Sequence, residues 1–244
     1  MFGLHLRLAS LFLASPRLVP FSIFTRSLRN GRGPAATLES ANAFGQDLSE
    51  MFELYEPPHC KIEPLSKPPV PLGVRKPRGE VHADGDWHRS VHVWLRTLDG
   101  RLLLQRRSQY KDTHPGMWDV SCAGHISAGD DSLGTARKEL EEELGVSVDV
   151  SVLRGALLCT LPSCARGATT RHGPFVCNEI QDIYLVQYPA EQLEAGALSL
   201  ESGEVEAIEL LDARKVLQAW ERAELSFVPR PPHYVRALRE GLGL

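Results

Sequence analysis

Residues 124–146 have the sequence GHISAGDDSLGTARKELEEELGV, and this stretch decides the fold. Its first part, Gly124–Gly129, is a loop bounded by glycines. In its second part, apolar residues recur every three or four positions, which predicts an amphipathic helix. Ser132 is the residue type that caps helix N-termini, and Gly145 is the type that ends helices. The stretch therefore predicts a glycine-bounded loop followed by a capped helix.

The predicted helix carries three glutamates on one face, because Glu139, Glu142 and Glu143 stand at positions i, i+3 and i+4. Like charges at this spacing repel one another and lower the stability of a helix. A divalent cation would neutralise them, since oxygen ligands are what Mg²⁺ prefers. A glutamate-rich helix by itself is more typical of a solvated helix face than of a metal site. The residues around the helix therefore have to distinguish these two interpretations.

Outside this stretch, residues 80–244 alternate between strand and helix patterns. Apolar runs of strand character occupy Ser90–Leu95, Leu102–Leu104, Val152–Thr160, Phe175–Val186 and Val205–Leu210. Asp99-Gly100 predicts a hairpin between the first two runs. Further helices are expected over Asp212–Glu221 and His233–Arg239. Strands and helices mixed in this way predict an α/β sandwich around a mixed sheet.

The N-terminal part differs in composition from the rest of the 244 residues. Residues 1–44 hold five arginines and one acid, a charge of +4, so the total of −4 leaves −8 for residues 45–244. Arginines among apolar and hydroxyl residues without acids are typical of an organellar transit peptide, for a mitochondrion or a plastid. A secretory signal around Leu8–Ala14 and a disordered basic tail are the alternatives, with a cytoplasmic location as the alternative address.

Prolines mark the next segment, with seven of them in residues 57–77. Proline lacks a backbone donor and fixes φ, so this density excludes a helix or a central strand. We therefore expect three parts: a leader over residues 1–44, a Pro-rich extended segment over 45–79, and a compact domain over 80–244.

Composition excludes several classes of protein. An isoelectric point near 6.1 argues against nucleic-acid binding as the main activity. No uninterrupted apolar run approaches the ~20 residues that span a bilayer, so we expect no membrane association. The five cysteines have irregular spacing and no CxxC pair, which indicates neither a zinc site nor a thioredoxin-type motif and favours free, mostly buried thiols.

The full spacing of residues 124–146 resembles the box of the Nudix hydrolase family, G-x5-E-x7-R-E-U-x-E-E-x-G-U. Asp130 and Lys138 replace the usual Glu and Arg, and every helix carboxylate is retained. The resemblance implies the Nudix α/β/α sandwich with a mixed sheet, and a small-molecule diphosphate substrate. It also implies Mg²⁺, with Mn²⁺ as the alternative, held by a set of ligands on the box: Glu139, Glu142, Glu143 and the carbonyl of Gly124.

Residues around the box resemble a narrower group, the type I isopentenyl-diphosphate isomerases and the plant and bacterial isomerase-like Nudix hydrolases. The matching stretches include Leu102–Ser108, Lys76–His82, Gly85–Arg89, Ala123–Gly129 and Asn178-Glu179. The resemblance implies that Arg107 and Lys111 bind the diphosphate, whereas an ordinary basic turn is the alternative.

Histidines bear on a second metal, which the isomerases hold through three His and two Glu. By resemblance His82, His88 and His125 stand close to the three His positions, and Glu179 stands at one acidic position. Cys177 stands at the other. The same three histidines would also be compatible with core or hydrogen-bonding roles.

One position separates hydrolysis from isomerisation. Ala123 stands where the isomerases have their catalytic cysteine, and Cys122 would point to the opposite face of a strand. Together with the complete box, this predicts a Mg²⁺-dependent hydrolase that converts an isoprenyl diphosphate, such as isopentenyl diphosphate, to its monophosphate and phosphate. The alternatives are delta-isomerase activity, hydrolysis of nucleoside diphosphate derivatives, and a diphosphate-binding module. Glu142, Glu139 and Glu179 are the candidate catalytic carboxylates, and the general base and the oligomeric state stay open.

Overall fold

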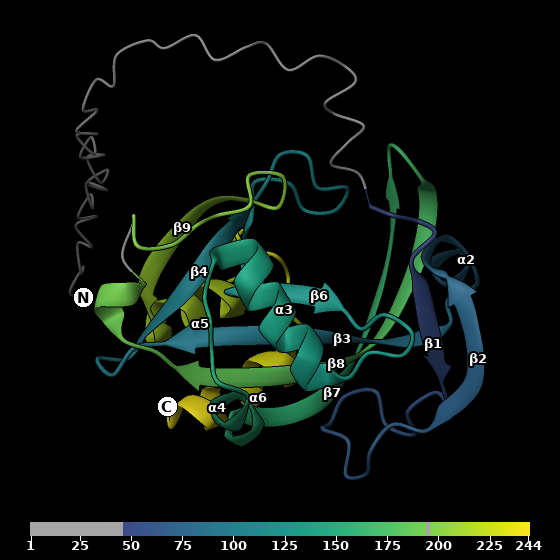
Figure 1. Ribbon diagram of the computed structural model, residues 1–244, viewed down its shortest axis with the longest axis horizontal. Coiled ribbons are helices and arrows are strands. Elements are labelled where there is room, and N and C mark those ends of the chain that lie inside the picture. Colours follow the sequence, from purple (N-terminus) through teal and green to yellow (C-terminus); the bar gives the residue numbers. More distant parts are fainter. Residues whose placement is uncertain (1–45, 194–195) are drawn as a thin grey trace, which may run out of the picture. The chain divides into compact units, whose positions relative to one another are not determined.

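The computed structural model describes residues 46–193 and 196–244, so the predicted leader over 1–44 lies outside the described residues. Helices and strands alternate along this part of the chain (Figure 1). In order they are β1 (Met51–Tyr55), β2 (Pro71–Pro77), α2 (Arg78–Asp84), β3 (Trp87–Arg96), β4 (Arg101–Arg107), β5 (Trp118–Asp119), β6 (Cys122–His125), α3 (Ser132–Leu144), α4 (Val150–Gly155), β7 (Leu157–Thr169), β8 (Gly173–Gln187), a 3-10 turn (Ala190–Gln192), β9 (Val205–Asp212), α5 (Ala213–Glu221) and α6 (Pro232–Leu242).

The main sheet of the described residues has seven strands and is mixed, as predicted. Its order is β5-β4-β3-β8-β7, with β6 paired to β3 and β9 paired to β4. Strand β3 pairs in parallel with β8 along the whole length of β3, whereas the other pairs are antiparallel. The Asp99-Gly100 turn forms as expected, but β3 and β4 share a single register pair, Arg96↔Leu102. Beyond it, β6 takes the place of β4 beside β3.

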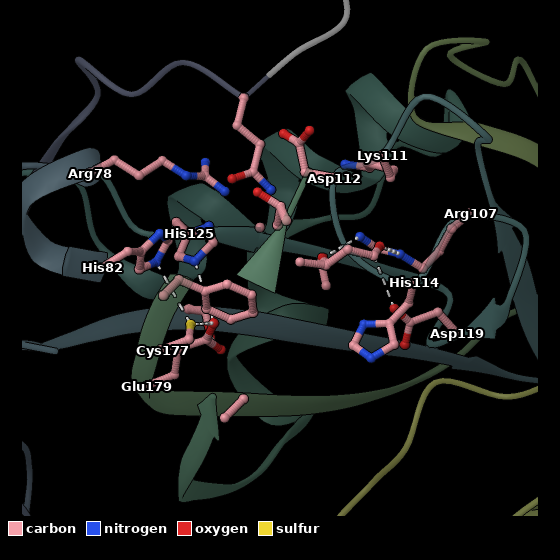
Figure 2. Close-up of a pocket in the computed structure, with 18 of the residues that line it drawn as sticks. Arg78, His82, Arg107, Lys111, Asp112, His114, Asp119, His125, Cys177 and Glu179 are labelled. Carbon is pink, nitrogen blue, oxygen red and sulfur yellow. Dashed lines mark hydrogen bonds and ion pairs between the residues drawn. The ribbon is translucent and has the colours of Figure 1, made fainter. Parts of the chain in front are cut away.

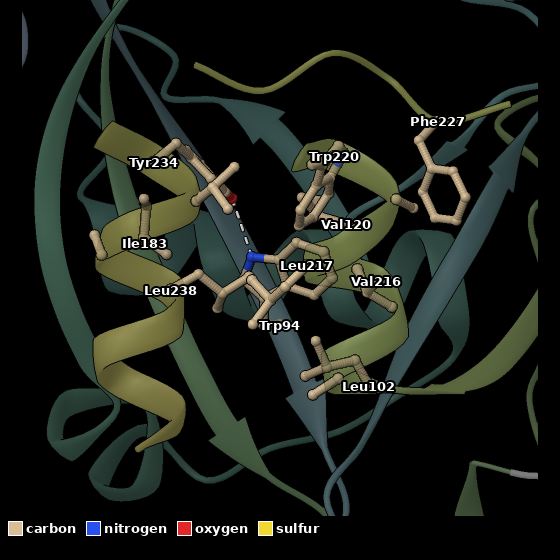
Figure 3. Packing of buried hydrophobic residues seen from close by; sticks show 14 of the residues in the cluster. Trp94, Leu102, Val120, Ile183, Val216, Leu217, Trp220, Phe227, Tyr234 and Leu238 are labelled. Atoms are coloured by element: carbon tan, nitrogen blue, oxygen red, sulfur yellow. Dashed lines mark hydrogen bonds between the residues drawn. The ribbon is translucent and has the colours of Figure 1, made fainter. Parts of the chain in front are cut away.

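Helices cover both faces of the sheet, which confirms the α/β/α sandwich (Figure 1). Successive side chains of a strand point to opposite faces. Accordingly Val91, Val93 and Leu95 of β3 pack with the apolar side of α3 and α4. Trp94 packs with α5 and α6 and donates a hydrogen bond from Nε1 to the Tyr234 hydroxyl at 3.0 Å (Figure 3).

The N-cap of helix α3 is Asp131, one residue before the predicted cap Ser132, so the helix begins one residue earlier than expected. Asp131 is the N-cap, and its Oδ1 accepts a hydrogen bond from the Gly134 N–H at 2.8 Å. Ser132 is the first helical residue instead, and its hydroxyl contacts that of Tyr184 at 2.7 Å. The predicted end is confirmed, because Gly145 adopts φ 67° and its N–H bonds back to the carbonyl of Glu141.

The strand predicted over Val152–Thr160 is wrong in its first part. Residues Val150–Gly155 form helix α4, and β7 starts at Leu157. Asp149 explains the difference, because its carboxylate accepts a hydrogen bond from the Ser151 N–H at 2.7 Å and so caps a helix. Alternating apolar residues in a segment this short fit either structure.

The Pro-rich segment ends in β2, which pairs with β1 in a small two-stranded sheet beside the main one. Helix α2 follows directly, and no strand or helix pattern in the sequence indicated it. Phe52, Leu54 and Val81 form a buried cluster between β1 and α2. The Ala128 N–H also donates to the Met51 carbonyl at 2.7 Å. These contacts attach α2 and β1 to the loop of residues 124–129.

The cysteines are all free thiols, as predicted. The expectation that they are mostly buried is wrong, since Cys60 and Cys164 are exposed and Cys159 and Cys177 are half-buried. Within residues 46–193 and 196–244, no helix combines the length and the hydropathy that a membrane crossing requires.

Candidate functional site

A cavity of about 950 Å³ lies where α2, α3, β6 and β8 come together (Figure 2). Strand β3 contributes side chains both to this cavity and to the hydrophobic core that packs against α5 and α6. His88, Ser90, His92 and Trp94 share one face of that strand, because side chains alternate along it. Ser90 and His92 line the cavity, whereas Trp94 lies in the core. The same face of β3 therefore packs against the core at Trp94 and lines the cavity at Ser90 and His92.

The three predicted helix glutamates all line this cavity, but they differ in burial. Glu143 is buried and accepts a hydrogen bond at Oε2 from Gln105 Nε2 at 3.0 Å. Glu139 is half-buried. Glu142 stands at the rim, where its side chain is 59% exposed and lies 3.9 Å from Lys138 Nζ. Glu141 is exposed and does not line the cavity, as the helical spacing predicts.

Gly124 lies directly against Glu139. A Cβ at residue 124 would overlap the Glu139 carboxylate and would stand 2.8 Å from its Cγ. Real Cβ atoms essentially never approach other atoms so closely. A side chain at residue 124 would therefore push the Glu139 carboxylate away from its present position beside β6.

Burial and mutual repulsion disfavour the charged forms of the two inner carboxylates, Glu139 and Glu143. Burial raises the pKa of Glu139 to about 7, and the neighbouring Glu143 and Glu142 add to the rise. Burial likewise raises the pKa of Glu143 to about 7, although Lys111 and Gln105 oppose it. A divalent cation would relieve this repulsion, and clustered carboxylate oxygens are the donor set that Mg²⁺ takes. The residues present therefore fit Mg²⁺.

Both predicted phosphate-binding cations line the cavity. Arg107 is held by its own neighbours, donating from Nη1 to Asp119 Oδ2 at 3.1 Å and from Nε to the Thr113 carbonyl at 3.0 Å. Lys111 forms an ion pair with Glu204, and burial lowers its pKa. Figure 2 shows the two side chains on the same side of the cavity.

Two further arginines at the cavity were missed by the sequence reasoning. Arg78 of α2 pairs with Glu50 at 3.0 Å (Nη1 to Oε2), and Arg230 pairs with Asp119. Asp119 is buried between Arg230 and Arg107, so this part of the wall keeps a net positive charge. Arg78 lies within the stretch Lys76–His82 that matched the isomerase-like branch, but the resemblance assigned it no role. No local pattern marks Arg230, which reaches the cavity only through the packing of distant elements.

The three predicted histidines come together with Cys177, from α2, β3, β6 and β8. One nitrogen of each of His82, His88 and His125 and the Cys177 sulfur all lie within 4.8 Å of one another. The sulfur is 3.7 Å from His82 Nε2 and 4.0 Å from His88 Nε2. Phe52 stacks on His88 and His125, with ring centroids 5.1 and 4.9 Å away.

These imidazoles are neutral at pH 7. Burial lowers the pKa of His82 to about 4 and that of His125 to about 3, and the Arg78 charge adds to both effects. His88 Nδ1 lies 3.1 Å from the Asp86 carbonyl, an arrangement that leaves Nε2 for the cluster. Nε2 of His125 is buried and makes no hydrogen bond of ordinary geometry, although Glu179 Oε1 lies 3.4 Å from it. Neutral imidazole nitrogens are the form in which histidine binds metals.

Glu179 lies beside this cluster on β8, two residues beyond Cys177. The thiol of Cys177 donates to Oε1 at 2.9 Å, and His125 Nε2 is 3.4 Å from the same oxygen. Ser90 and Gln181 each donate to Oε2 at 2.8 Å. The carboxylate predicted as a candidate base is thus oriented by four neighbours at the floor of the cavity.

A profile of the NUDIX domain matches residues 86–230, which include the sheet, α3 and most of the cavity wall. The chain belongs to the Nudix family. It is 42% identical over 166 residues to Nudix hydrolase 3 of Arabidopsis thaliana, over 68% of this chain and 21% of that relative. It is 39% identical over 70 residues to an isopentenyl-diphosphate Delta-isomerase of Serratia proteamaculans, over 29% of this chain and 39% of the isomerase.

The chain therefore spans only about a fifth of the Arabidopsis relative and well under half of the isomerase. Among solved structures, a Deinococcus radiodurans protein aligns with 78% of this chain and 98% of its own, with a TM-score of 0.48 and 18% identity. The Arabidopsis and Serratia relatives confirm the predicted membership of the isomerase-like Nudix branch.

Within this Nudix domain, Ala123 and Cys122 lie as the strand pattern predicts. Ala123 lines the cavity, whereas Cys122 is fully buried in the core against α3. Burial raises the pKa of the Cys122 thiol well above its usual value. The cysteine next to the isomerase position is therefore on the wrong side of β6 to reach a substrate.

Proposed function

We propose that this Nudix protein is a Mg²⁺-dependent hydrolase that cleaves a diphosphate linkage. The observation that carries the proposal is that acidic and basic side chains line the same cavity. Three glutamates of α3 line it together with Arg78, Arg107, Lys111 and Arg230. Acidic groups there suit a divalent cation, and basic groups suit phosphate oxygens.

Each residue has a distinct role in this proposal. Glu139 and Glu143, with the Gly124 carbonyl, would hold Mg²⁺, or Mn²⁺ in its place. Mg²⁺ when bound polarises a diphosphate and activates an attacking water. Arg107 and Lys111 bind the phosphate oxygens and neutralise the charge that develops on them. Glu142 at the open rim accepts the proton of the attacking water, and Glu179 is the alternative base.

The preferred substrate is an isoprenyl diphosphate such as isopentenyl diphosphate, giving the monophosphate and phosphate. The resemblance to the isomerases and the isomerase relative support this choice. Ala123 supports hydrolysis over isomerisation, because a methyl group can neither donate nor accept a proton. Nucleoside diphosphate derivatives are the alternative substrates, since the box contacts only the diphosphate.

A product analysis tests this proposal. The protein is incubated with Mg²⁺ and a panel of isoprenyl and nucleoside diphosphate compounds, and mass spectrometry identifies the products. We expect monophosphate products that disappear in Glu142→Gln. Glu141→Gln is the matched control, because Glu141 lies on the same helix outside the cavity. The proposal fails if no diphosphate is turned over, or if Glu142→Gln behaves as the wild type does.

A second candidate is isomerisation, favoured by the proximity of Glu179 to the histidine cluster. It predicts dimethylallyl diphosphate from isopentenyl diphosphate without release of phosphate. Glu179→Gln would remove that product, whereas Glu142→Gln would remove the hydrolysis products. The two activities therefore separate in a single assay.

We also propose that residues 1–44 direct the protein to a mitochondrion or a plastid. Their arginine content and lack of acids before Glu39 support this address. Fusion of residues 1–44 to a fluorescent protein should send it to the organelle. A diffuse cytoplasmic signal from the same fusion would instead favour the cytoplasmic alternative.

A further inference from the structure

His92 is a buried polar residue of the cavity wall that is neither a predicted metal ligand nor one of the cations proposed to bind phosphate. It stands in register with Ala123 on the antiparallel neighbour β6. Side chains directly opposite each other in such a pair share one face of the sheet, with Cβ atoms about 5 Å apart. Both residues line the cavity accordingly. Because Ala123 ends at a methyl group, His92 is the polar member of this pair that a bound substrate meets.

A chain of hydrogen bonds behind His92 fixes which ring nitrogen carries the proton. Trp94 Nε1 can only donate, and it donates to the Tyr234 hydroxyl oxygen at 3.0 Å (Figure 3). Nδ1 of His92 lies 3.0 Å from the same oxygen. Among the described residues, these two groups are the hydrogen-bond partners of that buried hydroxyl. The hydroxyl hydrogen is therefore donated to Nδ1 of His92, which accepts it and carries no proton of its own.

The proton of the His92 ring is then on Nε2. Burial lowers the pKa of His92 to about 4, and the charge of Arg230 adds to this effect, so the ring is neutral at pH 7. A neutral imidazole whose Nδ1 accepts a hydrogen bond has a donating Nε2–H. In the part of the chain that the structure describes, no group hydrogen-bonds to this Nε2. Since Nδ1 faces the core, Nε2–H is left to the cavity, where it can donate a hydrogen bond but cannot act as a base.

The surroundings of His92 favour an anionic acceptor. The charged groups that act on its ring are Arg230, Glu179, Asp119 and Arg107. Asp119 is shared by both arginines, so their side of the cavity carries a net positive charge. Glu179 lies on the opposite side of the cavity (Figure 2) and accepts hydrogen bonds from its own neighbours. A phosphate oxygen is the acceptor that fits a single N–H donor beside two arginines.

We propose that His92 donates its Nε2–H to a phosphoryl oxygen of the diphosphate substrate, and that Tyr234 is the positioning residue that holds His92 in this tautomer. This role of His92 rests on the proposed diphosphate hydrolysis for the identity of the ligand. It adds a neutral donor to the cations of the cavity wall. A neutral donor binds a phosphate oxygen without the desolvation cost of one more buried charge.

Nitrogen-15 NMR of the whole chain tests the tautomer. We expect the proton of His92 on Nε2, and the chemical shift of an unprotonated nitrogen for Nδ1, at every pH from 6 to 8. The signals are assigned by their loss in His92→Asn. Tyr234→Phe removes the donor to Nδ1 and leaves the cavity wall unchanged, because Tyr234 does not line the cavity. We expect both tautomers of His92 in that variant.

Calorimetry with methylenediphosphonate, a diphosphate analogue that is not hydrolysed, tests the contact in the presence of Mg²⁺. His92→Asn keeps an acceptor for the Tyr234 hydroxyl, because the Asn Oδ1 takes the place of Nδ1, but it lacks the Nε2–H. We expect this variant to bind the analogue about 10- to 100-fold more weakly, the effect of losing a hydrogen bond to a charged group. His92→Gln places an amide N–H where Nε2 stands and should restore most of the affinity.

His233→Asn is the matched control and should bind the analogue as the wild type does. His233 is also buried and donates from Nε2 to the Pro162 carbonyl at 2.9 Å, but it does not line the cavity. The role of His92 is overturned if its Nδ1 carries the proton, if the wild type does not bind the analogue, or if His92→Asn binds it as tightly as the wild type. Because the analogue is not cleaved, binding that depends on His92 in a protein without turnover would overturn the hydrolysis alone.

Discussion

Gly124 and Glu139 are in such close contact that a side chain at residue 124 would displace the Glu139 carboxylate. The contact joins the two halves of the sequence motif, since Gly124 lies on β6 and Glu139 on the second half of α3. It holds a backbone carbonyl and a carboxylate at one end of the cavity. Glycine is required here because the Glu139 side chain occupies the space of a Cβ at residue 124. It is not required for backbone conformation, since the φ of Gly124 is not in the left-handed range.

We expect Gly124→Ala to displace Glu139 and to lower activity by about 100-fold, because a shift of about 1 Å at a reacting centre has that effect. Steady-state kinetics with whichever diphosphate the product analysis shows to be turned over measure this loss. Gly134→Ala is the control, because its Cβ would meet only Asp131 at 3.6 Å or more. Activity of Gly124→Ala within twofold of the wild type would contradict the role of the contact.

The raised pKa values of Glu139 and Glu143 predict a pH-dependent stability of the metal-free protein. Each rises from an ordinary 4.5 to about 7 on folding, so folding takes up protons between these values. This contribution to stability is present below about pH 4.5 and is lost as the pH rises through 7. Saturating Mg²⁺ should weaken the dependence, because it competes with the protons.

The measurement compares the free energy of unfolding of the wild type and of the double variant Glu139→Gln, Glu143→Gln from pH 5 to 8. The difference isolates the two carboxyl groups from other titrating residues. We expect the wild type to lose stability relative to the double variant as the pH rises. A constant difference across this range would show that the two carboxyl groups titrate normally.

Removing the charge of Asp119 should strongly lower the free energy of unfolding. Asp119 is buried with Arg107 and Arg230 on either side, so Asp119→Asn would leave two arginines without their partner. Breaking a buried ion pair in this way costs about 3–5 kcal/mol. Chemical denaturation measures the change.

Asp99→Asn provides the comparison for this prediction. Asp99 pairs with Arg101 at the surface, where its side chain is 57% exposed. We expect a change of about 1 kcal/mol or less, because solvent screens such pairs. Similar losses in Asp119→Asn and Asp99→Asn would mean that the buried network contributes nothing beyond a surface pair.

Arg78→Met should raise KM for a diphosphate substrate by about 10- to 100-fold, the effect of losing a hydrogen bond to a charged group. We expect kcat to change less, because Arg78 would contact the phosphate oxygens in the bound substrate as well as in the transition state. Arg75→Met is the control, since Arg75 is exposed on β2 and does not line the cavity. An unchanged KM for Arg78→Met would exclude Arg78 from substrate binding.

The sequence alone determined the parts of the site that lie close together along the chain. Glu139, Glu142 and Glu143 share a helical face because 3.6 residues make a turn, and Gly145 ends that helix because it tolerates a left-handed backbone. The alternation of strand side chains likewise separated Ala123 from Cys122. Such rules are local, so sequence reasoning could apply them without knowing the fold.

Local rules failed where two structures fit the same short pattern. Val150–Gly155 is a helix because Asp149 caps it, although its valines alternate as in a strand. Asp131 rather than Ser132 caps α3, because two adjacent residues were both suitable caps and only their backbone angles separate them.

Only the tertiary structure decided which distant residues meet. Cys177 is 95 residues from His82 in sequence, and its sulfur lies 3.7 Å from that histidine because β8 runs beside β3 below α2. Arg230 reaches Asp119 through the connection between α5 and α6. The sequence determined the carboxylates because a helix fixes their spacing. Packing decided the neighbours of Cys177 and the placement of the two arginines, because those positions depend on how separate elements fold together.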